Sequence, residues 1–233
     1  MSNSNNSEHI QIITTHDGSH SLFNSELNET YHSVHGAIQE SNHVFIKNGL
    51  NFLIEKSLQD QINILEMGFG TGLNTLLTLK KSFEINHKIQ YTSIETFPLH
   101  KDVWSKLNYA DIIELRNHFE RLHTSAWGEW VSFSENFDLL KLNARLEEVL
   151  LQKNHYDLIY YDAFAPNKQP ELWTADVLST VIESLDWNGI FVTYCANGQL
   201  KRDLKDLGLT VETLPGPPGK KEMVRATRFQ GSF

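Results

Sequence analysis

The sequence predicts an α/β domain built on a mostly parallel, seven-stranded sheet with helices on both faces. From residue 62 onward, short apolar segments alternate with amphipathic ones, which is typical of βαβ units and a parallel sheet. A glycine-rich turn joins the first apolar segment to the first amphipathic one. Near the end, residues 210–214 and 222–229 flank a turn rich in proline and glycine, so we expect a closing antiparallel hairpin.

The core elements follow in the order that such a sheet requires. We expect strands at 62–67 and 89–95, two strands at 127–133 and 137–142 joined by a turn, a fourth core strand at 156–162, and a fifth from Gly189. We expect helices at 36–48 and 71–83, one opened by Pro98, and others at 111–123, 143–151, 170–185 and 198–207. In the helix at 111–123, apolar residues recur three or four positions apart, as on the buried face of a helix.

The N-terminal part of the chain differs from the core. Residues 10–15 and 21–23 flank Asp17-Gly18, a dipeptide that favours a tight hairpin turn. The first residues are polar and low in complexity, which predicts disorder. No linker-like composition separates this part from the first core strand. We therefore expect one domain with a disordered tail at 1–8, an extension on the substrate side at 9–58 and the core at 59–233.

The composition is that of a soluble globular protein. The 233 residues are 40% hydrophobic and 21% charged, and a chain of this length forms a core without covalent staples. The single cysteine, Cys195, excludes an internal disulfide framework and suits a reducing compartment. The chain begins without the basic and apolar stretches of a secretory signal, and no apolar run reaches the ~18 residues of a membrane span. We therefore expect a cytoplasmic protein.

The glycine turn indicates the kind of ligand. The first core strand ends near Glu66, and glycines follow at positions 68, 70 and 72, which places a ligand site at the carboxyl end of that strand. A dinucleotide fingerprint requires glycine where the chain has Leu73, and a P-loop requires a Lys-Ser/Thr pair that is missing here. Glu66 would repel a pyrophosphate but attract a cation. The alternative is an ordinary glycine-rich turn with no ligand.

S-adenosyl-L-methionine (SAM) fits this pattern, because it carries an ammonium and a sulfonium but no phosphate. A second acid, Glu95, ends the next strand, where a carboxylate meets ribose hydroxyls in such folds. A third, Asp162, ends a buried strand and precedes a loop rich in aromatic residues and proline. We expect Asp162 beside the methyl acceptor; the alternative is a structural cap on the following loop.

Three segments together resemble a known family. Residues 66–74 (EMGFGTGLN), 161–173 (YDAFAPNKQPELW) and 219–223 (GKKEM) are similar to the methyltransferase domain of MnmC-type enzymes, also called DUF752. The similarity runs from about Tyr31 to the end of the chain. Many members of the family fuse this domain to an FAD-dependent oxidase, and this chain resembles the standalone form. The resemblance implies a class I, Rossmann-like SAM methyltransferase that needs neither FAD nor a metal.

The resemblance also implies a reaction. The family uses SAM to methylate the 5-aminomethyl group of the wobble (2-thio)uridine in tRNA, which gives 5-methylaminomethyl-2-thiouridine. The implied partners are tRNA, contacted at its anticodon wobble position, and an upstream tRNA-modifying enzyme that supplies the amine. An amine with a pKa near 9–10 is largely protonated at neutral pH, and a nearby carboxylate can accept its proton. We expect Asp162 to be this catalytic base.

Site residues carry over by position. The resemblance implies that the cofactor contacts Glu66, Met67, Gly68, Gly70, Gly72, Asn74, Glu95, Asn143 and Ala144. The family often has Gly-Asp where this chain has Asn143-Ala144, so the residue that contacts the adenine is open. Expected substrate contacts are Tyr31, Phe164, Pro166, Lys168, Trp173, Lys220 and Lys221. For Phe164 and Trp173, packing in the core is the alternative to stacking on a base.

The charge distribution leaves a second function open. The formal net charge is −9, which argues against a general affinity for polyanions. Between Lys201 and Arg228, however, seven basic residues stand against four acidic ones. Candidate phosphate contacts are Lys168, Lys220, Lys221 and Arg225, with a merely solvated surface as the alternative. The acidic total favours a SAM-dependent methyltransferase for a small amine or other metabolite, and a catalytically silent binding module is the third possibility.

Overall fold

The computed structural model describes residues 9–229. The tail at 1–8, for which the sequence predicts disorder, lies outside the described residues. Within the described part, no helix combines the length and the apolar character that a membrane crossing requires.

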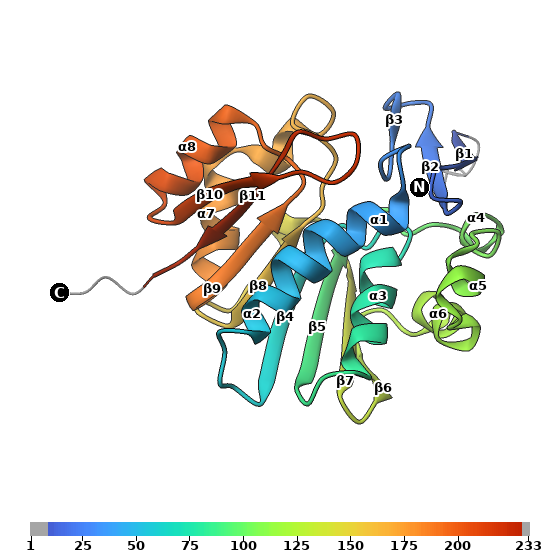
Figure 1. The fold of residues 1–233 in the computed structure, drawn as a ribbon, viewed down its shortest axis with the longest axis horizontal. Helices are drawn as coiled ribbons and strands as arrows, with labels where there is room; N and C mark the ends of the chain where they lie inside the picture. Colours follow the sequence, from blue (N-terminus) through green and yellow to red (C-terminus); the bar gives the residue numbers. More distant parts are fainter. Residues whose placement is uncertain (1–8, 230–233) are drawn as a thin grey trace.

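An eight-stranded sheet forms the centre of the molecule (Figure 1). In spatial order its strands are β10 (Thr210–Pro215), β11 (Glu222–Thr227), β9 (Leu185–Thr193), β8 (Tyr156–Tyr161), β4 (Gln61–Met67), β5 (Lys88–Glu95), β7 (Phe137–Asn143) and β6 (Trp130–Ser134). The five strands from β9 to β7 are parallel, whereas β11 and β6 run antiparallel to their neighbours. The predicted α/β fold with a closing hairpin is confirmed. The predicted number of seven strands is one short of the eight observed, although the individual strand expected at 127–133 is present as β6.

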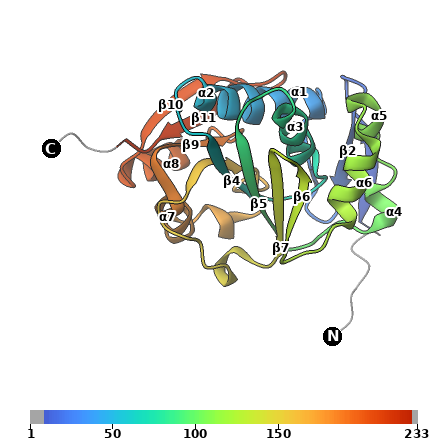
Figure 2. The ribbon, with the colours of Figure 1, turned by 90° about the horizontal axis from the view of Figure 1, so that it is seen from below.

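Each central strand contributes to two hydrophobic cores. All six residues of β8 are buried, as expected for a parallel strand with helices on both faces. Because side chains alternate along a strand, Leu158 and Tyr160 join one buried cluster, while Ile159 and Tyr161 join the other. Figure 2 shows helices on both sides of the sheet.

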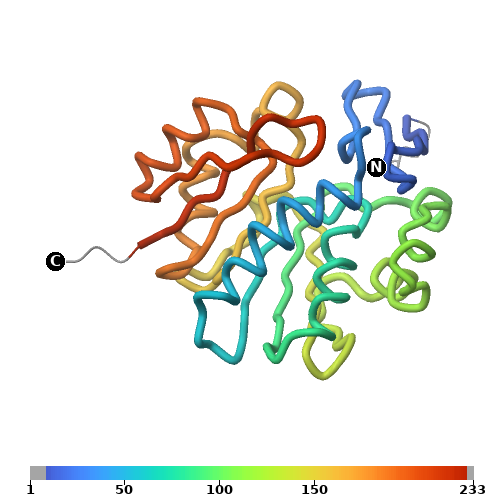
Figure 3. The backbone as a smooth tube through the Cα atoms, in the orientation of Figure 1, coloured from blue at the N-terminus to red at the C-terminus, as the bar shows by residue number. Residues whose placement is uncertain are grey.

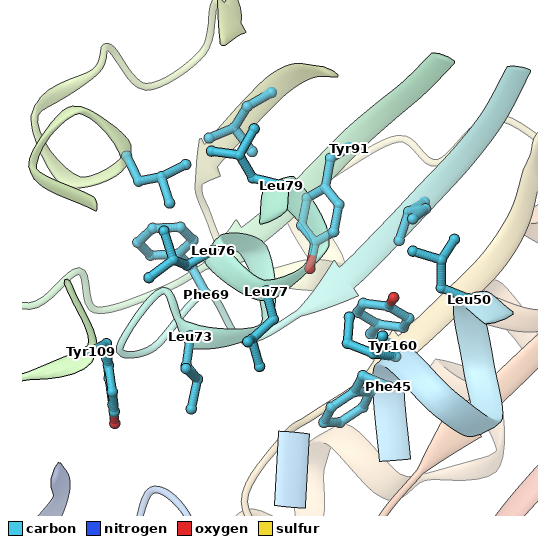
Figure 4. Close-up of a cluster of buried hydrophobic side chains, with 14 of the residues drawn as sticks. Phe45, Leu50, Phe69, Leu73, Leu76, Leu77, Leu79, Tyr91, Tyr109 and Tyr160 are labelled. Carbon is cyan, nitrogen blue, oxygen red and sulfur yellow. The ribbon is translucent and has the colours of Figure 1, made fainter. Parts of the chain in front are cut away.

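A long helix and α3 (Leu73–Ser82) cover the first face. The long helix consists of α1 (Ala37–Ser41), a π-helical segment (Asn42–Asn51) and α2 (Phe52–Ile54). It packs so closely that a Cβ on Gly49 would lie 3.1 Å from the side chain of Val192. Figure 4 shows Phe45 and Leu50 of this helix close to Tyr160 of the sheet. Helices α7 (Ala175–Ser184) and α8 (Gly198–Asp206) supply buried leucines to the second core.

Several predicted helices have other bounds. The helix expected at 111–123 is two helices, α5 (Tyr109–Ile113) and α6 (Arg116–Thr124), because Glu114 takes a left-handed conformation with φ +63°. The helix expected from Pro98 is α4 (Lys101–Trp104) and begins only after His100. The helix at 143–151 is wrong: a single 3-10 turn, Leu146–Glu148, stands there. The segment 170–185 divides into a 3-10 turn, Pro170–Trp173, and α7.

The N-terminal residues form a separate three-stranded antiparallel sheet of β1 (Ile10–Thr14), β2 (His20–Asn24) and β3 (Glu29–Thr30). The expected hairpin around Asp17-Gly18 is therefore confirmed. The sheet lies beside α4–α6, at the opposite end of the molecule from the last described residues (Figure 3). The hydroxyl of Tyr109 donates a hydrogen bond of 2.6 Å to the carbonyl of His20, which fixes this sheet to α5.

Candidate active site

The site lies where the chain reverses its direction across the sheet. From β4 the chain adds β5 and β7 on one side and then crosses to place β8 on the other side of β4. In open α/β sheets, ligands bind at the carboxyl ends of the strands at this switch point. A cavity of about 230 Å³ opens there. Its walls are the glycine turn, the ends of β5 and β8, the loop 163–172 and the N-terminal segment 24–32.

The three glycines of the turn are required by backbone geometry. All three have positive φ, at +90°, +48° and +74° for Gly68, Gly70 and Gly72. A Cβ on Gly68 would lie 3.0 Å from the carbonyl oxygen of Asp162, and one on Gly70 would lie 3.4 Å from the ring of Tyr31. Gly68 and Gly70 line the cavity. Gly72 is not part of the wall and instead caps the N-terminus of α3.

Glu95 lines the cavity and holds the glycine turn in place. Its carboxylate accepts hydrogen bonds from the backbone N–H of Gly70 at 2.9 Å and of Phe97 at 2.8 Å. Burial raises the pKa of Glu95 above its ordinary value. The side-chain amide of Asn143 donates to the carbonyls of Glu95 and Thr96 at 2.9 and 3.1 Å, and so fixes the end of β5.

The adenine side of the cavity differs from the expectation. Neither Asn143 nor Ala144 is part of the wall. The side chain of Asn143 is occupied by the strand end, and Ala144 offers its carbonyl to the hydroxyl of Thr96. Leu146 of the 3-10 turn lines the cavity instead, together with Ile94 and Phe97.

Glu66 lies beneath the cavity and not in its wall. Its side chain is fully buried, and one oxygen accepts hydrogen bonds from the hydroxyls of Ser93 at 2.6 Å and Thr75 at 3.0 Å. Burial raises its pKa to about 8. Glu66 thus links β4, β5 and α3 from within the core, because side chains alternate along a strand and position 66 points inward. Its neighbour Met67 does line the cavity.

Asp162 and Asn74 face the cavity together. The side-chain amide of Asn74, in α3, donates a hydrogen bond of 2.8 Å to the Asp162 carboxylate. Burial raises the pKa of Asp162 to about 7, and the charge of Glu40 adds to this, whereas the bond from Asn74 and the charge of Lys220 oppose it. The alternative role predicted for Asp162 was a structural cap on the following loop. In that loop, it is the Gln169 side chain that accepts a hydrogen bond from the Phe164 N–H, at 3.3 Å.

The amide oxygen of Asn74 is buried without a hydrogen-bond partner among the described residues. Asn74 is 3% exposed and lines the cavity. A buried acceptor without a donor is unfavourable by about 1–3 kcal/mol. A ligand that brings a cationic N–H donor to this point would remove that penalty, so the residues present fit the ammonium of SAM.

Three of the expected substrate residues line the cavity: Tyr31, Phe164 and Lys168. The rings of Tyr31 and Phe164 meet edge to face at 5.0 Å between centroids. The ammonium of Lys168 donates to the carbonyls of Leu27 and Asn28 at 2.9 and 3.1 Å. This lysine therefore joins the loop after β8 to the N-terminal sheet.

Other expected substrate residues have structural roles. Trp173 is 9% exposed, packs edge-on against Tyr161 and donates from Nε1 to the Phe164 carbonyl at 2.7 Å. These contacts favour core packing, the alternative to stacking on a base. Pro166 is partly buried and does not line the cavity.

Two of the expected basic residues are held in ion pairs. Lys220 pairs with Glu40 at 2.5 Å, and Arg225 pairs with Glu212 at 2.9 Å. Lys221 is exposed.

Sequence reasoning missed several polar residues in the cavity wall, of which His32 and Tyr194 are the two aromatic ones. His32 is buried and its Nε2 lies 2.8 Å from the hydroxyl of Thr71 in the glycine turn; burial lowers its pKa to about 4 and keeps it neutral. Tyr194 follows β9 and donates from its hydroxyl to the Ala163 carbonyl at 2.9 Å. Both residues lie outside the glycine motif. Only the position of Tyr194 at the end of a parallel strand could have indicated it.

Between residues 9 and 229, no group of three or more His, Cys, Asp or Glu side chains is arranged to hold a metal ion.

Comparisons with known proteins agree with this geometry. A family model described as S-adenosyl-L-methionine-dependent methyltransferase matches residues 114–229. Over 209 residues the chain is 29% identical to the tRNA 5-methylaminomethyl-2-thiouridine biosynthesis bifunctional protein MnmC of Campylobacter hominis, with 88% of this chain and 31% of that protein covered. The protein of the same name from Leptospira interrogans is 28% identical over 212 residues, with 85% and 32% covered. The chain therefore spans about a third of the length of these relatives.

A solved structure covers nearly the whole chain. The crystal structure of MnmC2 from Aquifex aeolicus matches with a TM-score of 0.77 and 29% identity, and the match covers 96% of this chain and 71% of that one. Fold and sequence thus point to the same group of proteins.

Proposed function

The chain belongs to the family of SAM-dependent methyltransferases, and we propose that it methylates the 5-aminomethyl group of the wobble (2-thio)uridine in tRNA. The product would be 5-methylaminomethyl-2-thiouridine. The names of the MnmC relatives and the match to MnmC2 support this choice of substrate. The observation that carries the proposal is the Asp162 carboxylate, which faces the cavity beside the glycine turn with Asn74 as its partner.

SAM would supply the methyl group, bound through residues that already stand in the wall. The unpartnered Oδ1 of Asn74 would accept from the ammonium. Glu95, held by two backbone N–H groups, would accept from the ribose hydroxyls. In place of the missing acid after Asn143, we propose that the apolar side chains of Ile94 and Leu146 contact the adenine. Glu66 would support the turn from beneath and not touch the cofactor.

The residues of the chain would mainly position the amine and remove its proton. Asp162 would accept a proton from the protonated amine, which frees the nitrogen lone pair. When bound, SAM would supply the methyl carbon: the lone pair would form the new N–C bond while the C–S bond of the sulfonium breaks and the sulfur leaves as a thioether. Alignment of nitrogen, carbon and sulfur would supply most of the acceleration. The edge-to-face pair of Tyr31 and Phe164 borders the same cavity and would hold the base.

The tRNA backbone would contact few of the expected cations. Lys168 donates hydrogen bonds to backbone carbonyls. Arg225 is paired with Glu212, and Lys220 is paired with Glu40. Exposed Lys221 is the remaining candidate among the four.

The free amine must come from an earlier tRNA-modifying enzyme, which we propose as a functional partner.

Methylation of a small amine or other metabolite is the second candidate. The formal charge of −9 and the ion pairing of Lys220 and Arg225 favour it, because both weaken attraction to a polyanion. Incubation with methyl-labelled SAM and, in parallel, bulk tRNA or a small-molecule extract separates the two. We expect label in tRNA. Label found only in the extract would favour the second candidate, and label in neither would contradict both.

A further inference from the structure

An ion pair joins two distant segments next to the cavity. Glu40 of α1 is 4% exposed. One carboxylate oxygen accepts from the ammonium of Lys220 at 2.5 Å, and the other accepts from the backbone N–H of Ser33 at 2.6 Å. Lys220 lies in the turn between β10 and β11, 180 positions away in the chain. The pair therefore fastens the β10–β11 turn to the start of α1 and to the segment that leads into it.

The approach of this turn is close. Gly219, the residue before Lys220, has φ +84°, and a Cβ placed on it would overlap the ring of His35. The backbone of the turn thus lies directly against the N-terminal segment.

Lys220 also touches the wall of the cavity. Its ammonium lies 3.6 Å from the centroid of the Tyr194 ring, a favourable cation–π contact. Tyr194 lines the cavity, and its hydroxyl holds the carbonyl of Ala163 at 2.9 Å. Ala163 follows Asp162 directly. A chain of contacts thus runs from Glu40 through Lys220 and Tyr194 to the backbone beside Asp162.

We propose that the Glu40–Lys220 ion pair is a positioning unit for Asp162: it holds the loop that follows Asp162 and balances the charge that this carboxylate experiences. The inference rests on the proposed function in so far as Asp162 is the base. Neither residue lines the cavity, so we give neither a catalytic role.

The charges around Asp162 come from several elements. The charges of Glu40 in α1 and of Lys220 shift the pKa of Asp162. The charge of Asp162 in turn raises the pKa values of Glu66 in β4 and of Tyr194. The titratable groups His32, Tyr31, Glu95, Lys168 and Glu171 line the same cavity, and His32 is neutral. Glu40 raises the pKa of Asp162 and Lys220 lowers it, so the two opposed effects offset each other while the pair is intact.

Removal of one partner should therefore change the protonation of Asp162. In Glu40→Gln the positive charge of Lys220 is left without its counter-charge, so the pKa of Asp162 falls. The pH midpoint for loss of activity on acidification should move down by about one unit. Below the midpoint, such a shift raises the reactive fraction up to about tenfold. In the double variant Glu40→Gln/Lys220→Met, neither charge remains and the midpoint should return toward that of the wild type.

The test measures these midpoints in two ways. The first is the pH dependence of SAM-dependent methylation of tRNA. The second is the titration of the Asp162 carboxyl carbon by 13C NMR, assigned through Asp162→Asn, which does not depend on activity. Lys205→Met is the matched control, because Lys205 is an exposed lysine of α8; its removal should leave the midpoint unchanged.

The outcomes are distinguishable. A lower NMR midpoint in Glu40→Gln that the double variant reverses supports the inference. Equal midpoints in the wild type and Glu40→Gln, or a double variant that stays shifted, overturn it. If the wild-type protein fails to methylate tRNA, the proposed function fails, while the NMR titration still decides whether the ion pair controls Asp162.

Discussion

At the scale of single residues, three strand-end carboxylates have three different roles. Glu95 orders the glycine turn, Glu66 is enclosed in the core beneath it, and Asp162 faces the cavity. The sequence predicts all three at strand ends and expects each of them to face a ligand, but it could not show that Glu66 points into the core instead. Which side of a strand faces the ligand depends on where the chain leaves the sheet, and that is decided by packing between distant segments.

Asp162→Asn should abolish most of the activity and leave SAM binding nearly intact. The amide keeps the shape of the carboxylate but cannot accept the amine proton, and loss of a general base typically reduces the rate by about 10²–10⁴-fold. Single-turnover methylation measures the rate, and calorimetry measures the affinity for SAM. Turnover within a few-fold of the wild type would show that another group takes the proton.

The raised pKa of Asp162 predicts a pH dependence. A base with a pKa of about 7 is protonated on acidification, so the rate should fall tenfold per pH unit well below that value. The acidic limb should be absent from the residual activity of Asp162→Asn. A limb that persists unchanged in this variant would belong to another group.

The raised pKa of Glu66 predicts that the stability of the protein, in contrast to its activity, falls as pH rises. Its pKa of about 8 in the folded state lies above the unfolded value near 4.3, so the folded protein binds more protons between these values. The free energy of unfolding should therefore fall as pH rises from about 5 to 8, by on the order of 3 kcal/mol. Urea unfolding of Glu66→Gln should show a flatter profile over this range. Parallel profiles for the two proteins would mean that Glu66 is charged in the folded state.

At the scale of elements, the glycine turn was the most predictable part of the site. Gly68, Gly70 and Gly72 all require positive φ, a constraint that leaves a direct trace in the sequence.

The prediction of a helix at 143–151 was wrong because no such backbone constraint is visible there. Its residues favour a helix, but intrinsic propensity is a weak prior that tertiary packing overrides; the Glu148 carboxylate accepts from the Arg145 N–H and closes a single turn.

Gly68→Ala should reduce SAM affinity at least tenfold. The new Cβ would meet the Asp162 carbonyl at 3.0 Å and would force the turn and β8 apart. Gly18→Ala is the matched control, since Gly18 has a similar φ of +82° but no atom within 4 Å of the added Cβ. Both variants should lose about 1–2 kcal/mol of stability from the left-handed backbone. Equal SAM affinity in the two variants would contradict the close approach.

Trp173→Phe should affect stability more than substrate binding. The change removes the Nε1–H donor to the Phe164 carbonyl and should lower the free energy of unfolding by about 1–3 kcal/mol. Affinity for tRNA should change less than twofold. A large loss of tRNA affinity without a loss of stability would instead indicate that Trp173 stacks on a base.

At the scale of the whole molecule, the fold brings the site together from six separate segments: 24–32, 67–74, 94–97, Leu146, 162–172 and Tyr194. The alternation of apolar and amphipathic stretches was enough to predict the sheet and the position of the cavity at its carboxyl edge. It could not place His32 or Lys220, because these reach the site through the N-terminal sheet and the β10–β11 turn. Contacts between segments this far apart in sequence leave no periodic signal.

The central claim is the transfer of a methyl group to the wobble aminomethyl amine, and nucleoside mass analysis tests it most directly. The protein is incubated with SAM and with tRNA from cells that lack this activity. The tRNA is then digested, and the nucleosides are separated and identified by mass spectrometry. We predict that the 5-aminomethyl nucleoside disappears as its 5-methylaminomethyl counterpart appears, and that Asp162→Asn leaves it unconverted. An unchanged wobble nucleoside in the presence of wild-type protein and bound SAM would contradict the account.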